Sequence, residues 1–229
     1  MRAFARQILA EWLIVRARLL RTRLGLWLAG LAGWVAWLGA AGDPAMLPIL
    51  TVRFGMLAAV LAVAYAAGSI TDRVALDISL THPTSAAAIA TGRWIGATAA
   101  ASLVAAVGVS AAVFGGHPVA PAAVGLAAGV AATAATAAAV LPAVWVGGNA
   151  LAGALFLYIA VFGALSPRGL APLLPAGVAR TSAAVLLEAL PSVWRYSLLA
   201  NADVVACVHA ATWVVGGLAL AALWLGRRR

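Results

Sequence analysis

The residues that could carry chemistry are few and scattered along the 229-residue chain. All fifteen basic residues are arginines, so the chain contains no lysine. The sequence therefore excludes a Walker phosphate-binding loop and Schiff-base chemistry, both of which need a lysine amine. The histidines His82, His117 and His209 are far apart and share no metal-ligand spacing. We expect no catalytic site, no metal and no cofactor in this chain.

The acidic residues give no sign of an intramembrane site either. We expect all of them at or beyond the ends of apolar segments: Glu11, Asp43, Asp72, Asp77, Glu188 and Asp203. A carboxylate that relays protons or binds a coupling ion lies within the membrane, so a proton- or sodium-driven transporter is disfavoured. His209 lies about two turns into the last apolar segment, where we predict a hydrogen bond between helices.

The composition predicts the elements that must hold these residues. The chain is 65% hydrophobic and 9% charged, with a mean hydropathy of +1.05, whereas soluble domains are roughly 25% charged. Its apolar runs of about 20 residues match the length that crosses ~30 Å of hydrocarbon. We predict an all-α integral membrane protein whose single transmembrane domain covers residues 1–229.

We predict six spans, each an apolar stretch of spanning length: about 24–41, 47–70, 94–115, 121–146, 150–165 and 204–225. A tight turn at Gly147-Gly148-Asn149 joins the fourth and fifth. With both termini in the cytoplasm, eleven arginines lie inside and three outside, which satisfies the positive-inside rule. Arg53, near the outer end of the second span, could snorkel. Arginines at span ends indicate contact with anionic lipid and no nucleic-acid partner.

Three further segments carry specific expectations. Residues 3–22 predict an interfacial helix, because one helix face carries an apolar stripe of Phe4, Ile8, Trp12, Val15 and Leu19. The alternative is a helical extension of the first span. In the outer-face segment 166–203, a helix at 178–190 is too short to cross and ends before Pro191, so we expect it to be re-entrant or to lie on the surface.

The fourth span is rich in small residues: Gly125, Gly129, Thr133 and Thr136. It packs deep in the protein or at a dimer interface, unless its alanines reflect base composition alone.

The cytoplasmic loop 71–93 is the most informative polar segment. It begins with Asp72-Arg73 and continues as a short amphipathic helix that contains Leu76, Asp77 and Leu80. Pro83 must end that helix. Thr84 or Ser85 can then cap a new helix that leads into the third span.

This arrangement resembles the permeases of the ABC-2 type. In that family an acid–base pair after the second span leads to a short leucine-rich helix, a Pro-x-Ser turn and a Gly-Arg or Gly-Lys pair. Asp72-Arg73, Leu76–Leu80, Pro83–Ser85 and Gly92-Arg93 match those positions. The chain departs from the pattern at Ala75, where the family often has Gly-Thr, and at Ala86, where it often has Arg. The N-terminal helix, six spans and outer helical segment extend the resemblance over nearly the whole chain.

The resemblance implies a permease subunit, most often an exporter, in the cytoplasmic membrane. The loop would be a coupling helix seated in a separate ATP-binding subunit, which holds the ATP and Mg²⁺. The implied contact residues are Asp72, Arg73, Leu76, Asp77, Leu80, Pro83 and Ser85. A second permease copy, in a homodimer or a heterodimer, would complete the pathway, and the outer segment with Arg180, Glu188 and Pro191 would act as a gate.

Three alternatives stay open. The loop could be an ordinary solvated connection. The chain could instead be a subunit similar to the haem-exporter B subunit of cytochrome c maturation, or a membrane scaffold or assembly protein without transport. The sequence carries no charge cluster that specifies a sugar, peptide, lipid or drug as substrate.

Overall fold

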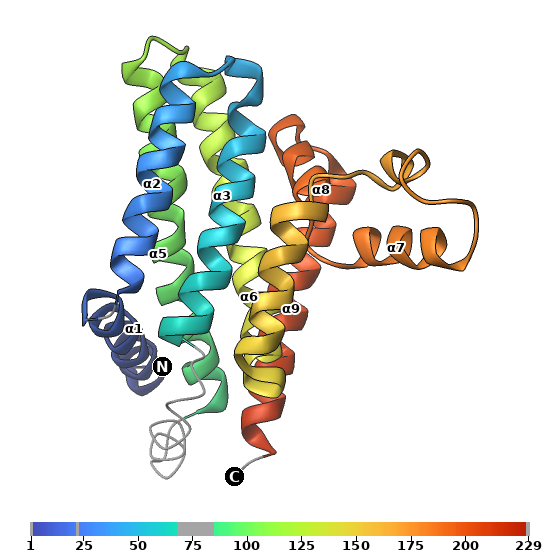
Figure 1. The fold of residues 1–229 in the computed structure, drawn as a ribbon. Helices are drawn as coiled ribbons and strands as arrows, with labels where there is room; N and C mark the ends of the chain where they lie inside the picture. Colours follow the sequence, from blue (N-terminus) through green and yellow to red (C-terminus); the bar gives the residue numbers. More distant parts are fainter. Residues whose placement is uncertain (1, 22, 68–84, 228–229) are drawn as a thin grey trace.

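The computed structural model describes residues 2–21, 23–67 and 85–227, and its regular structure within those ranges is entirely helical. Five stretches are long and apolar enough to cross a membrane: Leu24–Ala41, Pro44–Ala67, Ala86–Phe114, Val119–Phe162 and Val204–Gly226. They run side by side as a bundle (Figure 1). The protein is therefore an all-α, multi-pass membrane protein, as its composition predicts.

The first half of the bundle contains α1 (Arg2–Arg21), α2 (Leu24–Ala41), the short helix η1 (Pro44–Met46), α3 (Leu47–Ala62), the π-helix η2 (Val63–Ala67) and α5 (Ala86–Phe114). The second half contains α6 (Val119–Leu157), the π-helix η4 (Tyr158–Phe162), η5 (Pro167–Leu170), α7 (Val178–Ala189), α8 (Val193–Ser197), η6 (Leu198–Asn201) and α9 (Val204–Gly226). The bounds of α2 are those predicted. The third span begins at Ala86 rather than at Trp94, so residues 86–93 are its first two turns.

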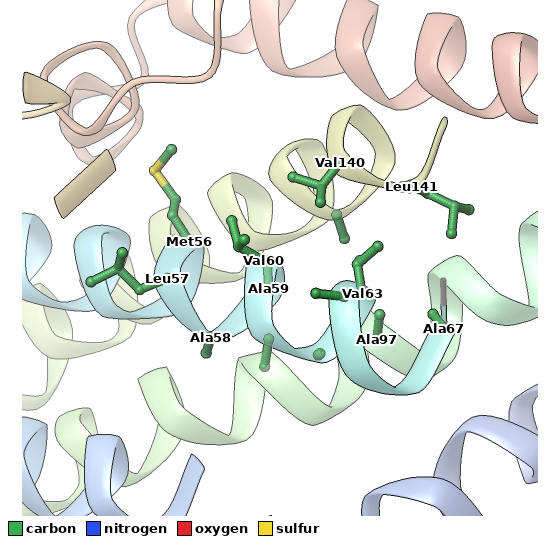
Figure 2. Packing of buried hydrophobic residues seen from close by; sticks show 14 of the residues in the cluster. Met56, Leu57, Ala58, Ala59, Val60, Val63, Ala67, Ala97, Val140 and Leu141 are labelled. Atoms are coloured by element: carbon green, nitrogen blue, oxygen red, sulfur yellow. The ribbon is translucent and has the colours of Figure 1, made fainter. Parts of the chain in front are cut away.

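Helix α3 forms the centre of the bundle. Of an apolar stretch of 18 residues in its span 67% are buried, against 17% for the α2 span. Figure 2 shows side chains such as Met56 and Val60 between the neighbouring helices, with Ala97 of α5 and Leu141 of α6 in the same cluster. Helices without a hydrophobic driving force between them associate through close packing of small residues, and the many alanines of this cluster provide that packing.

The small residues of α6 pack against α3, as predicted for a deeply placed fourth span. Gly125, Gly129, Thr133 and Thr136 are all buried. The Thr51 hydroxyl donates a hydrogen bond across the interface to the carbonyl of Gly125 at 3.0 Å. Such a bond between membrane helices contributes about 0.6 kcal/mol.

Helix α6 is a hairpin. Together with η4 it covers 44 residues, which as a straight helix would measure about 66 Å, twice the thickness of the hydrocarbon layer. Gly148 interrupts it with φ 69° and ψ −159°, a conformation that glycine adopts without steric cost. Thr136 and Ile159 line one cavity of about 250 Å³, although a straight helix would hold them about 34 Å apart. The chain therefore folds back at the predicted Gly147-Gly148-Asn149 turn.

Helix α1 is separate from the first span. It ends at Arg21, α2 begins at Leu24, and Figure 1 shows α1 almost end-on at the foot of the bundle while α2 runs lengthwise. The alternative of a helical extension is therefore wrong. Val15, from the apolar stripe, is fully buried, whereas Leu13 and Leu20 are exposed on other faces. Helix α1 thus has one apolar face for the protein and another open to its surroundings.

The outer-face segment contains α7 at the predicted place. The helix ends at Ala189, two residues before Pro191, and its 12 residues measure about 18 Å. It lies crosswise to the spans (Figure 1). It is therefore not a further span.

Candidate functional site

The predicted partner-contact residues Asp72, Arg73, Leu76, Asp77, Leu80 and Pro83 lie outside the described residues. Ser85 is described. It occupies the N-cap position of α5 with an extended backbone, as predicted, but its side chain makes no capping hydrogen bond. The described residues on both sides of the loop define its anchor points: η2 ends at Ala67, and α5 begins at Ala86.

A buried ion pair joins α1 to the start of α5. The Nε of Arg93 donates to Oε2 of Glu11 at 2.9 Å, and both side chains are more than nine-tenths buried. Nη1 of Arg93 also donates to the carbonyl of Ala67 at 2.9 Å. Arg93 therefore connects three elements: α1, the end of η2 and the beginning of α5.

Two more hydrogen bonds tie α1 to both ends of the loop. Nη1 of Arg18 donates to the carbonyl of Ala66 at 3.2 Å. The backbone N–H of Ser85 donates to Oε1 of Gln7 at 3.1 Å. We call this set of polar contacts, made by Gln7, Glu11 and Arg18 of α1 to Ala66, Ala67, Ser85 and Arg93, the α1 clamp.

Two glycines bring α1 and α5 close enough for these bonds. A Cβ at Gly92 would lie 2.7 Å from both the Ile8 carbonyl and the Glu11 Cβ. A Cβ at Gly96 would lie 2.8 Å from the Cβ of Val15. Small residues one helical turn apart let two helices pack at close range. Gly92 and Gly96 therefore allow the close approach of α1 to α5 that the contacts of the α1 clamp require.

The α1 clamp holds the two ends of the loop rigidly against α1. Breaking a buried ion pair by removing one partner costs about 3–5 kcal/mol, because the other charge stays buried without compensation. A displacement of either loop end must therefore move α1, α3 and α5 together or break the pair. Rigid packed elements transmit small shifts in this way. Within the described ranges, no group of three potential ligand side chains could hold a metal ion.

The outer-face segment has a polar cluster of its own. Glu188 of α7 forms an ion pair with Arg195 of α8, and the Arg195 guanidinium lies 4.8 Å from the ring centroid of Trp194. Pro191 is buried between these helices. The structure thus brings Glu188 and Pro191 close to Arg195, whereas Arg180 lies at the other end of α7 and does not join the cluster.

Hydrogen bonds attach this segment to α9. His209 contacts the Tyr196 hydroxyl through Nδ1 and the Ala189 carbonyl through Nε2, each at 3.2 Å. Since a carbonyl only accepts, Nε2 carries the proton and Tyr196 donates to Nδ1. Nε1 of Trp213 donates to the same Ala189 carbonyl at 2.9 Å. Burial raises the pKa of Tyr196, which keeps it a donor. The predicted hydrogen-bonding role of His209 is confirmed.

Sequence reasoning missed the residues of the α1 clamp. Glu11 was predicted only as an acid outside the spans. It lies three residues after Ile8 and four before Val15, which places it on the apolar stripe of α1. A single acid on the apolar face of an arginine-rich helix is the signal that could have identified it.

Neither a comparison with known protein families nor a comparison with curated proteins finds a match for this chain.

Proposed function

We propose that this chain is the membrane-spanning permease subunit of an ABC-2 type exporter, driven by ATP that a separate subunit hydrolyses. The loop between η2 and α5 is then the seat of that subunit, and a second permease copy completes the pathway. Both termini face the cytoplasm. The pattern from Asp72 to Arg93 supports the family, and the α1 clamp supports the mechanism.

The proposal includes six spans. The foot of the bundle holds both α1 and the C-terminal end of α9 (Figure 1). A chain whose two ends lie on one side of a membrane crosses it an even number of times. The five candidate stretches give six crossings, an even number, when the α6 hairpin is counted as two. The count of eleven arginines inside against three outside supports the cytoplasmic side for this end.

The single observation that carries the proposal is that α1 binds both ends of one loop. A solvated connection needs no buried charge at its base, yet Arg93 and Glu11 are buried together there. If an ATP-binding subunit pushes on the loop, the α1 clamp passes that movement to α3 and α5 instead of letting the loop ends yield. A buried ion pair is one arrangement that can keep the register between packed elements.

Co-purification of this chain with ATP-binding proteins of its own cell tests the proposal. We expect the wild-type protein to retain an ATP-binding subunit, and the variant with Leu76→Asp and Leu80→Asp to lose it. Leu173→Asp is the matched control, because Leu173 is an exposed leucine of the outer-face segment. Retention by the double variant, or a chain that inserts stably with no ATP-binding partner, would favour a scaffold and refute the transporter.

A further inference from the structure

The side of α1 that faces away from α5 stays exposed in the described part of the chain, and we call it the outward face. Glu11 and Val15 are buried on the side toward α5. At about 100° per residue, Leu13 lies about 160° around the helix from both of them. Leu9, Leu13 and Leu20 are 53%, 45% and 76% exposed, and their spacing places them on one side of the helix. An exposed apolar surface of this kind marks a contact with a membrane or with another protein.

Positive charge accompanies the leucines of the outward face. Arg6 lies within about 20° of Leu13 around the helix, Arg21 lies at the edge of the same face, and both arginines are exposed. Arg16 is exposed too, but its guanidinium already lies 6.0 Å from the ring centroid of the tryptophan of this helix. Glu11 is the only acid in α1, and it is buried in its ion pair. The outward face is therefore both apolar and basic, with no carboxylate of its own helix to offset the charge.

The position of α1 indicates what covers this face. Helix α1 ends at Arg21, and the span Leu24–Ala41 begins three residues later. Figure 1 shows α1 at the foot of the bundle, where that span begins. The outward face therefore lies at the level where hydrocarbon meets lipid headgroups. Water alone would leave the leucines exposed, and an apolar protein surface would desolvate the arginines at a cost, whereas a membrane surface with negative headgroups accommodates both.

We propose that the outward face of α1 binds anionic phospholipids in preference to zwitterionic ones. The leucines enter the acyl boundary, and Arg6 and Arg21 bind headgroup phosphates, which the planar fork of a guanidinium matches. A zwitterionic headgroup carries an ammonium that offsets its phosphate, so the arginines gain less from it. Arg6 and Arg21 are about 22 Å apart along the helix and therefore bind different lipids. The inference does not depend on an ATP-binding subunit, and the purified chain alone tests it.

The test is fluorescence quenching in nanodiscs that contain the purified full-length protein. Cys207 is replaced by serine, and a fluorophore is attached to a cysteine at position 10, an exposed alanine four residues after Arg6. The nanodiscs contain phosphatidylcholine with a small fraction of nitroxide-labelled phosphatidylglycerol or, separately, nitroxide-labelled phosphatidylcholine. A nitroxide quenches only at close range, so quenching reports which lipid occupies the face. We expect phosphatidylglycerol to bind about fivefold more tightly or better, since one basic residue near a negative surface contributes a factor of about five.

Matched variants locate the site. Arg6→Gln should lower the preference for phosphatidylglycerol at position 10 by about fivefold, whereas Arg6→Lys keeps the charge and should retain most of it. A second fluorophore at position 17, four residues before Arg21, reports Arg21→Gln in the same way. Arg168→Gln is the control, because it removes an exposed arginine of the outer-face segment and should leave the preference unchanged. Raising the salt concentration from about 0.1 M to about 1 M shortens the screening length from about 10 Å to about 3 Å and should lower the wild-type preference severalfold.

Three outcomes would overturn the inference: equal quenching by the two lipids, a preference that Arg6→Gln and high salt leave unchanged, or quenching by neither lipid. Quenching by neither would mean that protein, such as a second copy of this chain, covers the outward face. Because the salt titration is done with all arginines in place, it keeps the test decisive even if a variant fails to fold.

Discussion

The buried pair of Glu11 and Arg93 allows a quantitative prediction about the docking of α1. Glu11→Ala leaves the Arg93 guanidinium buried with the Ala67 carbonyl as its remaining hydrogen-bond partner among the described residues. Loss of one member of a buried pair costs about 3–5 kcal/mol. Because 1.4 kcal/mol corresponds to a factor of ten in an equilibrium constant, the population with α1 undocked should rise roughly a hundredfold to a few thousandfold.

Thiol labelling measures that population. Val15 is fully buried against Gly96, so a cysteine at position 15 reacts with maleimide only when α1 leaves α5. The native Cys207 is exposed and is replaced by serine first. When α1 reclosing outpaces the reaction, the labelling rate follows the open population. Glu11→Ala should therefore raise the rate at position 15 by about a hundredfold or more.

Two further variants make the test specific. Arg16→Ala removes an exposed charge from the same helix and should change the labelling rate by less than about threefold. Adding Arg93→Met to Glu11→Ala removes the uncompensated charge, so the double variant should label more slowly than Glu11→Ala alone. The reasoning is refuted if Glu11→Ala labels no faster than Arg16→Ala.

Two other predictions concern packing and topology. A Cβ at Gly217 would lie 2.2 Å from the Ala138 carbonyl oxygen, whereas one at Gly216 would meet no atom within 4 Å. Gly217→Ala should therefore destabilise α9 against α6 by about 1–3 kcal/mol and lower the thermal unfolding midpoint, while Gly216→Ala should not; equal midpoints would contradict the packing. A cysteine at Gly169 should react with an impermeant reagent from outside and one at Arg228 should not, and the reverse pattern would overturn the orientation.

Local sequence signals predicted most of the elements. Pro191 marked the end of α7, and Gly147-Gly148 marked the hairpin, because proline and glycine restrict or free the backbone wherever they occur. The helix start after Ser85 was predicted from its capping residues, but residues 86–93 were assigned to the loop because polar residues such as Arg93 suggested one. Helix α1 covers these polar residues and pairs with Arg93 through Glu11. A contact between two distant helices leaves no local pattern in the sequence.

The α1 clamp could not be read from sequence for the same reason. Glu11 and Arg93 are separated by 82 positions, and their pairing depends on how closely Gly92 lets α1 approach. Local propensity predicts elements, whereas contacts between distant elements need the packed structure.

We propose that the loop between η2 and α5 binds an ATP-driven partner. A photo-cross-link from Ser85, at the end of that loop, tests this most directly. A photoreactive amino acid replaces Ser85, just before α5, or Gly116, in the turn that joins α5 to α6 at the opposite end of α5. We predict a cross-link from position 85 to an ATP-binding protein and none from position 116. Absence of the cross-link at position 85, or equal cross-linking from both positions, would contradict it.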